Sequence, residues 1–221
     1  MTHNLRMSAW RAVCRQAMQS AAEAEARAAW QCGPDEDIPF NYRWEHVQQV
    51  VATANWLGRV VNADGEIVEA AAWLHDVRKT TPHHAQAGAE AALGILAATD
   101  FPAEKIEQVC TVIAQHEGLT RGEDAPPLKP LEAAVLWDAD KLTKLGVQAI
   151  IYAMSTPRTR GLTLAERLDG FHSFTRNVLS QTVMSMNTPA GRALAEQRYR
   201  EMCVALDEWA RDAAIGVRDA I

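Results

Sequence analysis

Apolar residues recur at helical spacing along most of the chain, whereas the strict alternation typical of a half-buried strand is scarce. Segment 66–76 is almost entirely apolar, so the helix that it forms must be buried. Turns that contain Gly, Pro or Asn separate the apolar segments. The pattern predicts an all-α fold in one domain, with helices over about 5–31, 44–61, 66–76, 84–98, 131–145, 163–186 and 189–214, and one after Phe101-Pro102.

Histidines and aspartates stand where several of these apolar faces approach an end. His46 begins the buried stripe of the second helix, His75-Asp76 ends the apolar segment, and His116 and Asp140 lie on the apolar faces of later helices. A buried imidazole or carboxylate without a partner costs on the order of several kcal/mol, so such a set needs a shared explanation. The simplest one is a divalent metal ion, or a pair of ions.

Each candidate also has an ordinary alternative. A single histidine on an apolar face is usually a core residue with satisfied ring nitrogens, and His75-Asp76 could cap a helix end. Asp138 competes with Asp140 for the carboxylate role. Of the adjacent histidines at 83 and 84, His84 is the better candidate, because small residues follow it at i+4 and i+8.

The composition narrows the choice of partner. The net charge of −6 and the pI of about 5.6 argue against binding of a nucleic-acid polymer, which needs clustered Lys and Arg. No stretch of 18 apolar residues indicates a membrane span, and the N-terminus does not resemble a signal peptide. The four cysteines are far apart, as expected for reduced thiols in a cytoplasmic protein. Whether the N-terminal helix covers its own core or forms a homodimer stays open.

The order His46, His75-Asp76 and Asp140 resembles the H…HD…D pattern of the HD-domain phosphohydrolase superfamily. The strings AAWLHDV at 71–77 and DADKL at 138–142 resemble the family's two best-defined motifs. The tail MNTPAGRALA at 186–195 is similar to a group of small bacterial stand-alone HD hydrolases. The resemblance covers about residues 40–205 and leaves the role of residues 1–40 open.

The resemblance implies an HD-type helical bundle with a metal-binding core at about 40–155, on which the N-terminal helix and the C-terminal helices at about 163–214 pack. It implies a primary ion held by His46, His75, Asp76 and Asp140. Members with two ions use two further histidines placed as His84 and His116 are. Imidazole and carboxylate ligands suit Mn, Fe, Co, Ni, Zn or Mg ions. One ion is expected, and a second is left open.

The chain departs from the family pattern at two positions near the expected ligands. Many relatives carry Arg three residues after the first histidine, where this chain has Gln49, with Arg43 on the other side. Two residues after the HD aspartate relatives often have Gly, whereas this chain has Arg78. The rim of the pocket is therefore expected to be narrower and more basic.

The hypothesis that follows is metal-dependent hydrolysis of a phosphate ester, either a nucleotide or another small phosphorylated metabolite. A bound ion lowers the pKa of water to about 7 and so provides a nucleophile near neutral pH. Asp76 and Lys79 are the expected catalytic residues, and Arg43, Arg78 and Lys141 are expected to contact phosphate. No general acid stands out. The alternatives are a di-iron oxygenase of the same superfamily and a ligand-binding protein without catalysis.

Overall fold

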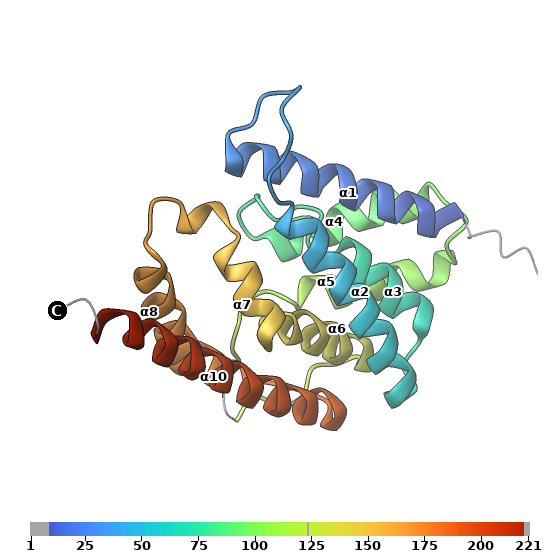
Figure 1. Cartoon of the computed structure of the whole chain (residues 1–221). Helices are drawn as coiled ribbons and strands as arrows, with labels where there is room; N and C mark the ends of the chain where they lie inside the picture. Colours follow the sequence, from blue (N-terminus) through green and yellow to red (C-terminus); the bar gives the residue numbers. More distant parts are fainter. Residues whose placement is uncertain (1–8, 123, 219–221) are drawn as a thin grey trace, which may run out of the picture.

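The computed structural model of the protein describes residues 9–122 and 124–218, and these residues form helices and loops with no strand (Figure 1). The helices are α1 (Ala9–Trp30), α2 (Tyr42–Val61), α3 (Gly65–Leu74), α4 (His84–Ala97), α5 (Ile106–Ala114), α6 (Leu131–Leu142), α7 (Val147–Met154), α8 (Leu164–Phe174), α9 (Ser180–Met184) and α10 (Pro189–Arg218). Short 3₁₀ turns span Ala103–Lys105 and Pro157–Thr159, and a π-helical turn spans Thr175–Leu179. The predicted all-α class is confirmed.

The predicted helices match the observed ones, with three differences. The first helix was expected from residue 5, but residues 5–8 lie outside the described part of the chain, where α1 begins at Ala9. The segment predicted at 163–186 is helical from Leu164 to Met184, but a π-helical turn replaces the α-helical hydrogen bonding between α8 and α9. Helix α7 was not predicted at all; its eight residues are too few to show a clear helical period.

Helix α6 forms the centre of the bundle, and all of its residues except the first, Leu131, are buried. It packs against α2, α3, α5 and α10. Its four charged side chains each bind a different neighbouring segment, because a buried charge must be paired. Glu132, for example, accepts hydrogen bonds from the Asp64 backbone N–H (2.9 Å) and from Gln108 (3.0 Å). Asp138, Asp140 and Lys141 are described with the site below.

Two long amphipathic helices lie on opposite sides of this centre in Figure 1, α1 above it and α10 below. Helix α1 packs on α2, α3 and α4 and buries Trp10, Cys14 and Met18. Helix α10 packs on α2 and on α6 to α9 and buries Met202 and Leu206. The described helices include none that is both long enough and apolar enough to cross a membrane.

Candidate metal centre

Six predicted ligands come together where α2, α6 and the ends of three other helices meet. His46 lies on α2 and Asp140 on α6, whereas His75 and Asp76 directly follow α3. His116 comes shortly after α5, and His84 is the first residue of α4. Two overlapping groups have ligand atoms that all lie within 4.8 Å of one another: His46 with His75 and Asp140, and His75 with Asp76 and His116.

Hydrogen bonds at the Nδ1 atoms fix the tautomer and the orientation of the histidine rings. His75 Nδ1 lies 2.8 Å from the Ala72 carbonyl oxygen, and His116 Nδ1 lies 2.7 Å from the Ile113 carbonyl oxygen. Since a carbonyl oxygen only accepts, both Nδ1 atoms must carry the proton. Each Nε2 atom is then left with a lone pair, which is the form of histidine that binds metal.

His46 reaches the same state through a threonine. The Thr143 hydroxyl donates to the Asp140 carbonyl oxygen (2.6 Å), so it must accept from His46 Nδ1 (3.0 Å). The Nε2 atoms of His46 and His75 are buried and have no hydrogen-bond partner within the described ranges. A buried nitrogen without a hydrogen-bond partner destabilises the folded state. A cation shared with the nearby carboxylates would give both Nε2 atoms a partner. The donor set therefore fits a divalent metal ion.

Asp76 lies at the centre of the cluster and uses both of its oxygens. Oδ2 is 3.5 Å from His46 Nε2 and 3.4 Å from His75 Nε2, while Oδ1 is 3.4 Å from His116 Nε2 and 3.8 Å from His84 Nε2. Asp140 Oδ1 is 3.2 Å from His46 Nε2. Both carboxylates are thus placed to share ions with the surrounding imidazoles.

Three cationic side chains also contact the two carboxylates. Arg43 donates to Asp76 and, through two further N–H groups, to Glu25 of α1 (2.9 and 3.1 Å). Lys141 donates to Asp140 and to the His116 carbonyl oxygen (2.8 Å). The Lys79 ammonium is 3.2 Å from Asp76 Oδ1 and 2.9 Å from His84 Nε2.

These charges keep the two carboxyl groups ionised in spite of their burial. Burial alone would raise the pKa of Asp76, but His75 and Arg43 hold it well below its usual value. The pKa of Asp140 is likewise held low, because the charge of Lys141 outweighs the effect of burial. Burial lowers the pKa of His46 to about 4 and lowers the pKa values of His116 and His84. At neutral pH the cluster therefore presents ionised carboxylates together with neutral imidazoles at His46, His84 and His116.

A cavity of about 800 Å³ opens onto this cluster. Arg43, Lys79 and Lys141 line it, as does Lys144, which the sequence reasoning missed. Lys144 donates to the Tyr42 hydroxyl, and the Tyr42 ring stacks on His46 at a centroid distance of 5.7 Å. The aromatic residues on the cavity wall are Trp30, Phe40, Tyr42, Tyr152, Phe171 and Phe174. The cavity can thus accommodate a ligand with an anionic part and an apolar part.

Some predicted residues are not in the cavity wall. Arg78 is exposed and does not line the cavity, so the structure does not bring it to the cluster as the sequence reasoning expected. Glu45, which directly precedes His46, is exposed and also lies outside the lining. Glu117 does line the cavity, and its Oε1 atom is 3.6 Å from His84 Nδ1. Glu25 also lines the cavity. It was not predicted from the sequence, because it lies outside the residues that resemble the family.

Asp138, the rival of Asp140, has a different role. Its carboxylate accepts from the backbone N–H groups of Asn187 (2.7 Å) and Thr188 (2.8 Å) and from the Thr188 hydroxyl (2.7 Å) at the start of α10. A Cβ atom at Gly191 would lie 2.3 Å from Asp138 Oδ2, so only glycine fits this contact. Asp138 therefore fastens α10 to α6.

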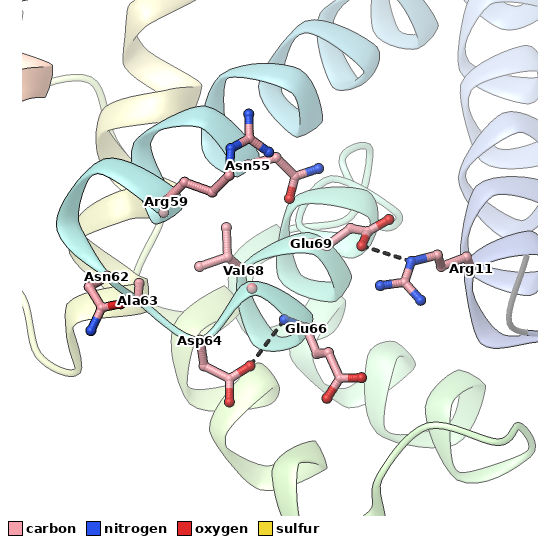
Figure 2. A pocket seen from close by; sticks show the side chains of 11 residues that line it. Arg11, Asn55, Arg59, Asn62, Ala63, Asp64, Glu66, Val68 and Glu69 are labelled. Carbon is pink, nitrogen blue, oxygen red and sulfur yellow. Dashed lines mark hydrogen bonds and ion pairs between the residues drawn. The ribbon is translucent and has the colours of Figure 1, made fainter. Parts of the chain in front are cut away.

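A second hollow, of about 610 Å³, lies at the turn between α2 and α3 (Figure 2). Its polar side chains have structural roles: Arg11 pairs with Glu69 (2.8 Å), and Asp64 caps α3 by accepting from the backbone N–H groups of Glu66 and Ile67. None of the six clustered ligands lines it. The cavity over the histidines is therefore the better candidate for a functional site.

Comparisons with known proteins agree with this choice. Residues 43–145 match the model of the family described as the HD domain. The chain is 27% identical over 187 residues to the uncharacterized protein YpgQ of Bacillus subtilis, which covers 84% of this chain and 91% of that relative. All six candidate ligands lie within the matched segment.

Solved structures share the fold at low identity. Bacillus subtilis YpgQ, in a crystal structure in complex with ADP, has a TM-score of 0.63 at 22% identity, over 90% of this chain and 97% of that one. An HD-superfamily hydrolase from Bacillus thuringiensis has a TM-score of 0.61 at 20% identity, over 91% and 98%. A predicted HD-superfamily hydrolase from an uncultured Thermotogales bacterium has a TM-score of 0.55 at 21% identity, over 92% and 90%.

Proposed function

Because residues 43–145 form an HD domain, we propose that the protein is a metal-dependent hydrolase of a small phosphate ester. HD domains bind divalent metal ions, and the superfamily consists mainly of hydrolases. The observation that carries the proposal is the pair of buried, unpartnered Nε2 atoms of His46 and His75 beside two ionised carboxylates. His46, His75, Asp76 and Asp140 would hold the ion.

The ion would supply a water of lowered pKa as nucleophile and positive charge for the phosphoryl oxygens. The surrounding residues prepare the site for that chemistry. Arg43 and Lys141 each bond a ligand carboxylate and so hold Asp76 and Asp140 in fixed orientations. Lys79 is a third exposed and lines the cavity, so its ammonium can also donate to a phosphoryl oxygen.

The lining of the cavity supports a phosphorylated substrate with an aromatic or apolar part. The basic side chains gather near the ligands, and aromatic rings form the wall. An anionic phosphate would lie among the former and a flat ring against the latter. That the related Bacillus subtilis protein was crystallised with ADP supports a nucleotide among the candidate substrates.

The experiment is phosphate release from a generic aryl phosphate by the Asp76→Ala variant, with Mn, Co, Ni, Zn, Fe and Mg ions tested separately. We expect metal-stimulated release to disappear, because Asp76 contacts ligands on both sides of the cluster. The matched control is Asp35→Ala, which removes an exposed carboxylate from a loop and should keep full activity. Full activity in the Asp76 variant would refute the hydrolase proposal.

The substrate class is tested with the unmodified protein and a panel of phosphate esters. Nucleotides and sugar phosphates are compared at equal concentration with the most effective ion. We expect esters that carry an aromatic ring to give the higher kcat/KM, because the aromatic wall can contact the ring. Equal turnover of ring-free esters would show that the aromatic wall does not select the substrate.

A further inference from the structure

We propose that this centre holds one metal ion and that the Lys79 ammonium takes the place of a second ion between Asp76 and His84. The inference rests on the proposed function, since it concerns the ion content of the same centre. Six potential ligands are present, which is enough for two ions. The position of one lysine decides between one ion and two.

The lysine nitrogen lies between the two atoms that a second ion would have to share. Nζ of Lys79 is 2.9 Å from His84 Nε2 and 3.2 Å from Asp76 Oδ1, and these two atoms are 3.8 Å apart. A divalent ion bound to both would need about 2.0–2.2 Å to each. The ion would therefore lie directly beside the ammonium group, and their charges would repel each other.

The ammonium and a metal ion also compete for one lone pair. A lysine ammonium only donates, so His84 Nε2 must accept from it and the proton of the ring must be on Nδ1. Nδ1 faces the Glu117 carboxylate at 3.6 Å, which favours that tautomer. Glu117, His84, Lys79 and Asp76 thus form one chain of alternating partners, and His84 has no free lone pair for an ion.

The charges around the cluster favour a single ion as well. Asp76 and Asp140 are the two carboxylates in the ligand groups, and they already face Arg43, Lys79 and Lys141. Glu25 offsets the charge of Arg43. These three cations and three carboxylates already cancel, so a first divalent ion leaves the cluster with a surplus of two positive charges, and a second would add two more.

The groups of candidate ligands also separate His84 from the other histidines. His116 shares a group with His75 and Asp76, whereas His84 belongs to no group of three in the described part of the chain. His84 therefore serves as the partner of Lys79. A centre with one ion lacks the pair of irons on which the oxygenase alternative depends, so a single ion argues against that alternative.

The experiment counts metal ions. Protein is loaded with excess Mn²⁺, desalted and analysed by elemental mass spectrometry, and its electron paramagnetic resonance spectrum is recorded. We expect about one ion per chain and an uncoupled spectrum for the wild type. Lys79→Ala should bind about two ions and show the signal of an exchange-coupled pair, because it frees both His84 Nε2 and Asp76 Oδ1.

Three controls separate this effect from a general loss of positive charge. Arg78→Ala removes the adjacent exposed cation and should keep the wild-type count. Lys79→Arg keeps the charge and should also bind one ion. The double variant Lys79→Ala with His84→Ala should return to one ion, because the second site again lacks a ligand.

Two ions in the wild type, or one ion in folded Lys79→Ala, would overturn the inference and leave the hydrolase proposal standing. Lys79→Gln is the second test variant if Lys79→Ala does not fold, and an unchanged count there also counts against the inference. A wild type that binds no ion under these conditions would instead refute the proposed function, so the two failures can be told apart.

Discussion

Two buried aspartates of α6, Asp138 and Asp140, lie two residues apart and face opposite sides of the helix. Asp140 points to His46 and Lys141 at the metal centre, whereas Asp138 points to Asn187 and Thr188 at the start of α10. The partners of Asp140 include a cationic ammonium; those of Asp138 are neutral N–H and O–H groups.

The difference in partners reverses the effect of burial. Burial raises the pKa of Asp138 in spite of its four hydrogen bonds. For Asp140, the cationic Lys141 outweighs the same penalty and holds the pKa well below its usual value. A buried carboxylate thus stays charged, and available to an ion, where cationic groups face it, whereas one that neutral donors satisfy serves as a helix cap.

The largest effect that tests this comparison is expected for Asp140→Asn. The amide is a poorer ligand and removes one negative charge, so the affinity for Mn²⁺ should fall roughly 1,000-fold, beyond the 10–100-fold typical of residues that only support a ligand. Isothermal titration calorimetry measures it. An affinity within threefold of the wild type would mean that Asp140 does not belong to the centre.

The stability of the protein should also depend on pH when no metal is bound, because of His46 on the Asp140 side of α6. The pKa of His46 is lowered to about 4, against about 6.5 in the unfolded chain. Between these values the unfolded state binds more protons, so stability is complete above about pH 6.5 and declines as the pH falls toward 4. Chelator-treated protein should lose about 3 kcal/mol over this range, measured by urea denaturation. His46→Gln should lack this part of the dependence; an unchanged profile would exclude His46 as its source.

A smaller effect is expected on the other side of α6. Asp138→Asn places an amide N–H₂ where an oxygen now accepts from Asn187 or Thr188, and should lower the free energy of unfolding by about 2 kcal/mol. The affinity for Mn²⁺ should stay within a few-fold of the wild type. Urea denaturation and the same calorimetric titration give both numbers. If Asp138→Asn instead weakens metal binding as much as Asp140→Asn does, the two sides of the helix are not independent.

The sequence allowed the helices to be placed because an apolar face has a period that reads directly from the residues. The face of α2 and the apolar run of α3 are examples. The resemblance pointed to six ligands, and they lie together in the structure. Spacing could not decide between Asp138 and Asp140, because both are buried and only the surrounding helices distinguish them.

Contacts between distant segments could not be predicted from the sequence, for the same reason. The pair Glu25 and Arg43, the bond from His46 to Thr143 and the Lys144 contact with Tyr42 each join residues that no local pattern links. Each depends on how helices cross, which periodicity does not encode. Arg78 shows the converse: adjacency to Asp76 in the sequence suggested a role at the pocket, but the turn after α3 directs it to solvent.

The Glu25–Arg43 contact has a consequence for how much of the chain makes a working centre. Glu25 belongs to α1, outside the segment that matches the family model, yet its carboxylate neutralises the guanidinium that bonds Asp76. A fragment trimmed to residues 43–145 would keep all six candidate ligands but lose Glu25. The charge of Arg43 would then be unbalanced beside Asp76, the central carboxylate of the cluster. The residues that support the candidate metal centre therefore begin upstream of the segment that matches the family model.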